Sequence, residues 1–278
     1  MGADFGLCRA TVPVETLRAG AGRPAAPRHI IGGHMTRDLS RKRYWLVGAS
    51  EGLGAALARR MSAAGAHLVL SARSEAPLQS LAAELPGPAE VVTLDLADAD
   101  SIAQAAEQVG EVDGVVHMAG VYWPFGAQDW QADQANAMAD VNFTGAMRLM
   151  GVVVPPMVAR GQGHIVLTGS LSGFRGLPGA IGYCASKAGV MVLAESMYAD
   201  LRKTGVRVQL VNPGFIRTRL TDKNDFAMPF IMEPEDAAGI FLDHMQRGGF
   251  KRSFPTGFSL VFRLGQFLPD WLYYRIFA

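Results

Sequence analysis

The chain has 278 residues, of which 49% are hydrophobic and 18% charged, and its formal net charge is +1. These values suit one large soluble domain, or at most two, with enough chain to bury a substantial core. A balanced charge with no basic stripe argues against a nucleic-acid-binding protein. The scattered histidines show no metal-ligand spacing, so we expect no metal site. Two cysteines, Cys8 and Cys184, make no disulfide framework and favour a reducing, cytoplasmic setting.

Residues 1–34 differ in character from the rest of the chain. They are rich in Gly, Ala, Pro and Arg, with Asp4 and Glu15 as their acids, and lack the continuous apolar core of a secretory signal. The composition leaves a transit peptide open, although serine is scarce. We favour a disordered leader, with Met35 as an alternative start, and leave this stretch out of the fold argument.

The first strand–turn–helix unit begins at Arg43. The apolar run 44–47 predicts a buried strand, and the glycine turn 48–54 leads into a predicted helix over 55–64. This arrangement places free backbone N–H groups and the helix dipole where a phosphate can bind. Glycines let the backbone approach a pyrophosphate closely. The spacing G-x-x-x-G-x-G is by itself weak evidence for a dinucleotide site.

The second predicted strand, residues 67–71, bears on the choice of cofactor. In a dinucleotide fold, an acid after this strand binds the ribose 2′-hydroxyl, whereas a basic residue accommodates a 2′-phosphate. The chain has Arg73 there and no acid, so NADP(H) is favoured over NAD(H). Glu51 in the glycine turn argues against this, because it would repel the same phosphate. The alternative for Arg73 is a solvated loop charge.

Helices and apolar strands then alternate to about residue 250. Helices are predicted at 76–85, 98–109, about 132–160, where Pro155 and Pro156 can kink the end, and from Tyr183 to about Lys203. Strands are predicted at 91–94, 114–118, 164–168 and 206–211. Near-continuous apolar strands separated by helices predict an α/β fold, a doubly wound parallel sheet covered on both faces. Ligands of such sheets bind beyond the carboxyl ends of the strands.

Tyr183 and Lys187 stand four residues apart, so on a helix they share one face. A nearby ammonium favours the charged form of a phenol, and Ser170 can hydrogen-bond the oxygen on which the tyrosine acts. The trio is therefore a candidate acid/base apparatus. Taken alone, the pair is as well explained by a surface tyrosine and lysine on an amphipathic helix.

In order along the chain, these motifs resemble the short-chain dehydrogenase/reductase family over roughly residues 43–245. The glycine turn, Asp95-Leu96, Ala119-Gly120, Asn142, Ser170 thirteen residues before a Tyr-x-x-x-Lys, and Asn212-Pro213-Gly214 all stand at the family's places. The resemblance implies a single Rossmann domain over residues 43–250. It implies catalytic roles for Asn142, Ser170, Tyr183 and Lys187. The cofactor-binding residues it implies are Gly48, Ser50, Glu51, Gly52, Leu53, Gly54, Arg73, Asp95, Leu96, Ala119, Gly120, Tyr183, Lys187, Pro213, Gly214, Ile216 and Thr218.

By the same resemblance, Tyr183 is the general acid/base during hydride transfer and Ser170 orients the carbonyl or alcohol. Lys187 lowers the pKa of Tyr183 towards working pH, where proton transfer is most effective, and holds the nicotinamide ribose. Asn142 anchors a water that leads protons to Lys187. The family also suggests a homodimer or homotetramer paired through long helices.

Two departures from the family pattern concern local packing. His117-Met118 replaces two asparagines whose amides tie neighbouring strands together. His117 can supply one of those hydrogen bonds and Met118 cannot, so we expect altered packing rather than lost binding.

The C-terminal end also departs from the family. Residues 249–255 suggest a last strand, followed by an aromatic-rich extension that ends at residue 278. The extension is too interrupted to span a bilayer. It predicts two short helices packed on the domain or on a subunit partner, and the rival is an interfacial membrane contact.

The substrate side is marked by an apolar, Met-rich segment over 222–232 and by Tyr122, Trp123 and Phe125. Methionines adapt to varied apolar shapes, so these residues favour a lipophilic substrate, although ordinary packing explains them too. The expected activity is an NADP(H)-dependent oxidoreductase that interconverts a carbonyl and a secondary alcohol. The alternatives are a non-catalytic dinucleotide-binding sensor or scaffold, and a peripheral membrane-associated reductase.

Overall fold

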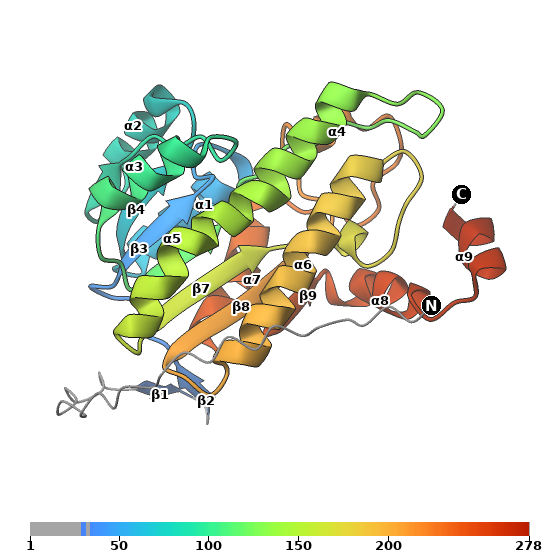
Figure 1. Cartoon of the computed structure of the whole chain (residues 1–278). Coiled ribbons are helices and arrows are strands. Elements are labelled where there is room, and N and C mark those ends of the chain that lie inside the picture. Colours follow the sequence, from blue (N-terminus) through green and yellow to red (C-terminus); the bar gives the residue numbers. More distant parts are fainter. Residues whose placement is uncertain (1–28, 32–33, 278) are drawn as a thin grey trace, which may run out of the picture.

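A computed structural model describes residues 29–31 and 34–277 (Figure 1). Two short strands, β1 (His29–Ile31) and β2 (His34–Thr36), pair antiparallel in a hairpin. Most of the predicted leader, residues 1–28 and 32–33, lies outside the described residues, so its disorder stays a prediction.

The main element is a seven-stranded sheet in which every pairing is parallel, with the order β5-β4-β3-β6-β7-β8-β9. Its strands are β3 (Arg43–Val47), β4 (His67–Ser71), β5 (Ala89–Val91), β6 (Gly114–His117), β7 (Gly163–Thr168), β8 (Val206–Pro213) and β9 (Lys251–Phe254). The predicted α/β fold with a doubly wound parallel sheet is confirmed. The chain turns from one half of the sheet to the other between β3 and β6, which is where such sheets bind ligands.

Helices cover both faces of this sheet (Figure 1). One layer contains α3 (Ala99–Val109), α5 (Gly145–Ala159) and α6 (Ile181–Leu201), and the other contains α1 (Gly52–Ala63), α2 (Glu75–Glu84) and α7 (Pro234–Gln246). Alternate strand residues face the two layers: Trp45 and Val47 join one buried cluster, and Tyr44 and Leu46 join the other. The remaining helices are α4 (Ala132–Met138), α8 (Thr256–Gly265) and α9 (Asp270–Phe277).

The long helix predicted over 132–160 has an internal interruption. A π-helical turn, Ala139–Thr144, joins α4 to α5, whereas Pro155 and Pro156 lie within α5 and do not end it. By length and composition, Ala132–Ala159 is the one helix of the described chain that could cross a membrane. Its residues Ala146, Leu149 and Val153 are buried in the core cluster under the sheet, which is the environment of a core helix.

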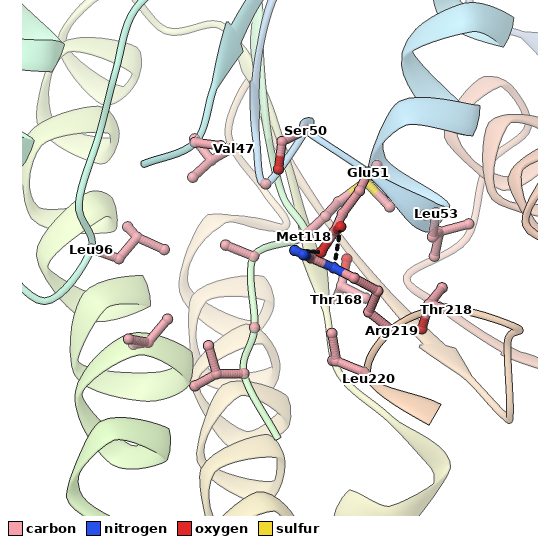
Figure 2. Close-up of a pocket in the computed structure, with 18 of the residues that line it drawn as sticks. Val47, Ser50, Glu51, Leu53, Leu96, Met118, Thr168, Thr218, Arg219 and Leu220 are labelled. Atoms are coloured by element: carbon pink, nitrogen blue, oxygen red, sulfur yellow. Dashed lines mark hydrogen bonds and ion pairs between the residues drawn. The ribbon is translucent and has the colours of Figure 1, made fainter. Parts of the chain in front are cut away.

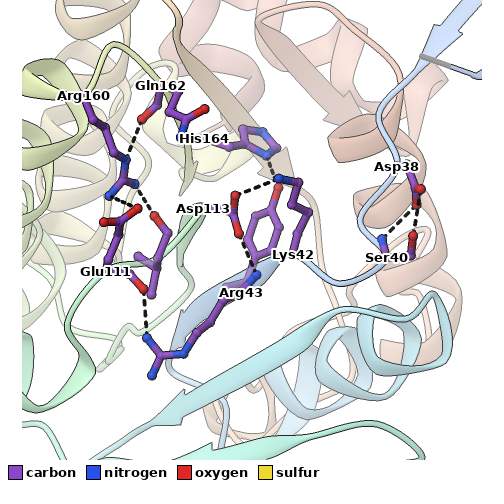
Figure 3. Close-up of polar contacts among 11 residues, drawn as sticks. Asp38, Ser40, Lys42, Arg43, Glu111, Asp113, Arg160, Gln162 and His164 are labelled. Atoms are coloured by element: carbon purple, nitrogen blue, oxygen red, sulfur yellow. Dashed lines mark hydrogen bonds and ion pairs between the residues drawn. The ribbon is translucent and has the colours of Figure 1, made fainter. Parts of the chain in front are cut away.

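The amino ends of the central strands are joined by polar contacts (Figure 3). Asp113 accepts hydrogen bonds from the Lys42 ammonium (2.9 Å) and from the backbone N–H of Arg43 (3.0 Å). The Arg43 guanidinium continues to both carboxylate oxygens of Glu90. Arg160 reaches the carbonyls of Val112 and Gln162. At this edge of the sheet, side-chain hydrogen bonds and ion pairs therefore connect the loops to the strands.

Near the same amino edge, buried side chains of β3, β7 and β8 form a chain of hydrogen bonds. Tyr44 Oη lies 2.8 Å from His164 Nδ1, and His164 Nε2 lies 2.7 Å from Gln209 Oε1. The Gln209 amide nitrogen donates to two carbonyls, so its oxygen must accept from His164 Nε2–H. His164 Nδ1 therefore accepts from the Tyr44 hydroxyl. Burial holds the pKa of His164 well below its usual value, which keeps the imidazole neutral.

Candidate active site

The glycine turn lies between β3 and α1 and allows two close backbone approaches. Gly48 has φ +93°, and a Cβ there would lie 2.4 Å from the backbone nitrogen of Ala119. A Cβ on Gly54 would lie 1.9 Å from the carbonyl oxygen of Gly48. Helix α1 starts at Gly52 without a side-chain cap, so its first N–H groups are available to an anion. These features fit a dinucleotide pyrophosphate.

A single cleft runs along the carboxyl ends of the strands and contains all seventeen residues predicted to bind the cofactor. The sequence analysis did not identify other residues of its wall, which are Val47, Ala72, Ser74, Leu94, Met118, Val121, Val141, Thr168, Gly169, Arg219, Leu220 and Thr221. Several of them immediately flank a predicted residue, and the βα alternation alone could have indicated them. Arg219 immediately follows the predicted residue Thr218, but nothing in the sequence indicated its pairing with Glu51.

Arg219 pairs with Glu51 across this cleft (Figure 2). The guanidinium donates through Nε and Nη2 to the two carboxylate oxygens, at 2.5 and 2.6 Å. The pair joins the glycine turn to the segment that follows β8. Because Arg219 neutralises Glu51, the repulsion that a 2′-phosphate would meet there is reduced. Arg73 lines the same cleft, is exposed, and forms no ion pair within the described chain.

Asn142 lies buried in the π-helical turn, and such turns occur frequently at functional sites. Its amide makes a reciprocal pair with the backbone of Val121: the oxygen accepts from the N–H (2.7 Å) and the nitrogen donates to the carbonyl (2.9 Å). The nitrogen also donates to Ser186 on α6. Asn142 thereby fixes the loop after β6 against the helix that carries Tyr183.

Of the four predicted catalytic residues, Tyr183 and Lys187 line one end of the cleft, and Ser170 and Asn142 are buried beside it without lining its wall. The Lys187 ammonium is buried, donates to the carbonyl of Thr168 (3.0 Å), and lies 5.8 Å from the centre of the Tyr183 ring. The Ser170 hydroxyl lies 2.8 Å from the Ser172 hydroxyl and close enough to Tyr183 to influence its pKa. Tyr183 and Lys187 come from α6 and Ser170 from the loop after β7, so the strand end and the helix bring these three side chains together.

Burial determines the protonation states of Tyr183 and Lys187. Desolvation raises the pKa of Tyr183 to about 12, with the Ser170 hydrogen bond acting in the opposite direction. Desolvation also lowers the pKa of Lys187 to about 8. The tyrosine is therefore a protonated phenol at neutral pH. Lys187 is not among the groups that shift the pKa of Tyr183 in this structure, so the expectation that it lowers this pKa stays a prediction.

Three polar side chains at neighbouring strand ends have unpaired atoms within the described part of the chain. These are both ring nitrogens of His117, the hydroxyl of Thr168 and the amide oxygen of Asn212, at the ends of β6, β7 and β8. The hydrogen bond suggested for His117 is thus not formed to any described residue. Burial and the nearby Lys187 charge lower the pKa of His117 to about 3, so its imidazole is neutral.

The wall beside Tyr183 is apolar and aromatic. Tyr122 meets the Tyr183 ring edge-on, with 5.1 Å between the ring centres, and packs with Phe125 and Met138. Hydrogen bonds connect this wall to the apolar, Met-rich segment over 222–232, here called the lid. Lys223 donates to the carbonyl of Tyr122 (2.7 Å), and the Tyr122 hydroxyl donates to Asn224 (2.9 Å).

Comparison with known proteins places these features in one family. The family model described as short chain dehydrogenase matches residues 42–227. An uncharacterized oxidoreductase of Myxococcus xanthus (strain DK1622) is 36% identical over 243 residues, covering 85% of this chain and 96% of its own.

Two solved structures share the fold at high coverage. A short chain dehydrogenase/reductase family protein is 30% identical with a TM-score of 0.73, covering 78% of this chain and 97% of its own. A short-chain type dehydrogenase/reductase from Mycobacterium marinum is 28% identical with a TM-score of 0.71, covering 80% and 96% of the two chains.

Proposed function

The chain belongs to the short-chain dehydrogenase/reductase family of NAD(P)-dependent oxidoreductases, and from this premise we propose that it uses NADP(H) to interconvert a carbonyl and a secondary alcohol. The observation that carries the proposal is the placement of Tyr183 and Lys187 at one end of the dinucleotide cleft, with Ser170 buried beside them. The nicotinamide, when bound, supplies or accepts the hydride, and the protein handles the proton.

In this proposal Tyr183 is the general acid and base. With a pKa of about 12, its hydroxyl is protonated at neutral pH and donates its proton to the carbonyl oxygen during reduction. Ser170 donates a hydrogen bond to the same oxygen and positions it. The Lys187 ammonium, held by the Thr168 carbonyl, favours the tyrosinate that remains after the transfer. Asn142 keeps the loop after β6 in register with α6.

Preference for NADP(H) rests on charge at the adenine end of the cleft. Arg73 offers a guanidinium that no carboxylate of the described chain engages, and Glu51 is neutralised by Arg219. A planar guanidinium matches the geometry of a 2′-phosphate. A lipophilic substrate is supported by the apolar wall of Tyr122, Phe125 and Met138 beside Tyr183.

The cofactor proposal is tested by assaying a panel of ketones and alcohols with NADPH and NADH in parallel. We expect higher kcat/KM with NADPH. Arg73→Gln should weaken NADPH binding by about tenfold and leave NADH binding unchanged, because a hydrogen bond to a charged group contributes about 1.5–3 kcal/mol. Arg59→Gln, which removes a surface charge from α1, is the matched control. Faster turnover with NADH would overturn the role of Arg73.

We also propose that the chain assembles as a homodimer or homotetramer through α5 and α6. These long helices expose Met147, Val158, Val192 and Tyr198, which is apolar surface that a second copy would cover. Light scattering coupled to size-exclusion chromatography measures the assembly, and a monomer at micromolar concentration would contradict it.

A further inference from the structure

The C-terminal helices α8 and α9 expose an unusual amount of apolar surface. Among the described residues, seven of the fourteen exposed large hydrophobic side chains lie between positions 260 and 276. They are Leu260, Val261, Leu264, Phe267, Trp271, Tyr274 and Ile276, here called the tail face. Apolar side chains gathered in this way mark an interaction site more often than isolated ones do.

The inner sides of the same helices are packed, so the exposed residues are not the result of an undocked tail. Phe258 contacts Phe230 and Phe262, and Phe262 contacts Phe277. Arg175, from the loop between Ser170 and Tyr183, donates to the carbonyls of Gly265 and Leu268 and pairs with Asp270. Its guanidinium also lies 4.0 Å from the centre of the Tyr273 ring. These contacts therefore hold the two helices, and with them the tail face, against the rest of the domain.

Helical spacing separates the two sides. On α8, Leu260, Leu264 and Arg263 project to one side, and Phe258 and Phe262 project to the other. On α9, Trp271, Tyr274 and Arg275 share a side opposite Tyr273. Phe267, the most exposed of the set at 83%, lies in the connection between the helices.

The charges of the tail face indicate which kind of partner would bind it. Between residues 256 and 277 the charged residues are Arg263, Asp270 and Arg275, and Asp270 is engaged by Arg175. Arg263 and Arg275 are exposed and form no ion pair with any described residue. A second copy placed symmetrically on this face would bring like charges together. An anionic lipid surface complements them instead.

The residue types fit the same partner. Trp and Tyr have an apolar body and a polar tip, and they favour the boundary between hydrocarbon and lipid headgroups. Arg263 and Arg275 would lie at headgroup level, with Leu264 and Phe267 below them. We propose that the tail face docks the enzyme on an anionic lipid surface. The proposal concerns binding alone and does not depend on hydride transfer.

The tail face borders the substrate side of the active site. Phe230 of the lid packs on Phe258 of α8, with 5.3 Å between ring centres, and Arg175 lies in the loop that leads to Tyr183. A lipid surface at the tail face would therefore lie next to the lid and the apolar wall.

Co-sedimentation of the full-length chain with vesicles tests the docking. Vesicles of phosphatidylcholine alone are compared with vesicles containing phosphatidylglycerol. We expect binding to the anionic vesicles, and at least a tenfold loss of binding in the double variant Phe267→Ser, Trp271→Ser. Arg263→Gln with Arg275→Gln should weaken binding to anionic vesicles by roughly fivefold for each arginine and leave any binding to neutral vesicles unchanged. Trp130→Ser, another exposed tryptophan, is the matched control.

A spectroscopic measurement keeps the test independent of sedimentation. Anionic vesicles should shift the tryptophan emission of the wild type to shorter wavelength, and Trp271→Phe should abolish this shift although Trp45, Trp123 and Trp130 remain. NADPH binding confirms that each variant is folded. Unchanged emission and no sedimentation would overturn the proposal. Equal binding by wild type and the double variant would also overturn it. A change from oligomer to monomer in the double variant, without vesicle binding, would assign the tail face to a second copy instead.

Discussion

The two edges of the main sheet use polar residues in opposite ways. At the amino edge, Asp113, Glu90 and the Tyr44–His164–Gln209 chain are paired by hydrogen bonds, and one buried atom nearby, His244 Nε2, has no partner among the described residues. At the carboxyl edge, His117, Thr168 and Asn212 have unpaired buried atoms, and Lys187 keeps a charge in an apolar surrounding. The amino edge is mostly paired, whereas the carboxyl edge has three buried polar side chains without described partners, of which Thr168 lines the cleft. We therefore expect substitutions at the amino edge to change stability and substitutions at the carboxyl edge to change cofactor binding and catalysis.

Gly54→Ala should produce the largest effect on cofactor affinity. A Cβ there would lie 1.9 Å from the Gly48 carbonyl oxygen, so the turn and α1 must move apart. We expect dinucleotide affinity to fall about a hundredfold, as misplacing a binding element by 1 Å can cost that much. Fluorescence titration with NADPH measures it. Gly151→Ala in α5, where no atom lies within 4 Å of the added Cβ, should bind normally. Normal binding by the Gly54 variant would contradict this account of the glycine turn.

Lys187→Met should stabilise the fold while removing activity. The pKa of Lys187 falls from 10.5 to about 8 on folding, so its charge destabilises the folded state at pH 7. Allowing for the lost bond to Thr168, we expect a gain of about 2 kcal/mol in the free energy of unfolding. Denaturant titration measures it, with exposed Lys203→Met as the control.

The difference in stability between wild type and Lys187→Met should depend on pH, and its direction can be predicted. Between pH 8 and 10.5 the unfolded chain binds the extra proton, so wild-type stability should rise with pH through this window. The advantage of Lys187→Met should shrink over the same range. A constant difference from pH 7 to pH 10.5 would show that the lysine is not held in the charged, desolvated state.

Tyr44→Phe should have an effect of similar size and opposite sign on stability, at the amino edge. It leaves His164 Nδ1 buried without its donor, which costs about 1–3 kcal/mol of stability. The kcat should not change, because the edge is remote from Tyr183. Thermal unfolding and a steady-state assay measure the two quantities, and Tyr198→Phe on the surface of α6 is the control. A fall in kcat without a loss of stability would break the division between the edges.

The Glu51–Arg219 pair should have the smallest effect. Arg219→Gln exposes the Glu51 charge to the cofactor phosphates and should weaken NADPH binding by about two- to fivefold, as expected for an exposed ion pair. The double variant with Glu51→Gln should recover most of the loss. Arg217→Gln, which removes the neighbouring exposed pair with Glu233, is the control. Additive effects of the two single changes would exclude a coupling between them.

The sequence identified more of the carboxyl edge than of the amino edge. The glycine turn and Arg73 each follow a strand, and parallel strands bring their ends together. Asn142 and the Tyr183–Lys187 pair lie on helical segments and were identified by their spacing. The strand predicted at 91–94 is found at Ala89–Val91, and Val92 and Leu94 continue the backbone hydrogen bonds to Leu70 and Ala72 beyond its end.

Contacts between distant segments could not be predicted in the same way. Glu51 and Arg219 are 168 residues apart, and Tyr44 and His164 are 120 apart. No local pattern links such residues. The π-helical turn at Asn142 also had no periodic signal, since it needs the reciprocal bonds to Val121. The two short helices of the extension were anticipated, but their anchor, Arg175, was not.

The central claim is that Tyr183 transfers the proton at the end of the dinucleotide cleft. Tyr183→Phe removes the hydroxyl and keeps the ring against Tyr122, so a direct test measures NADPH affinity and single-turnover ketone reduction in this variant. We predict NADPH affinity within about twofold of wild type and a reduction rate lower by about a thousandfold. A reduction rate equal to that of the wild type, with NADPH bound, would contradict the account.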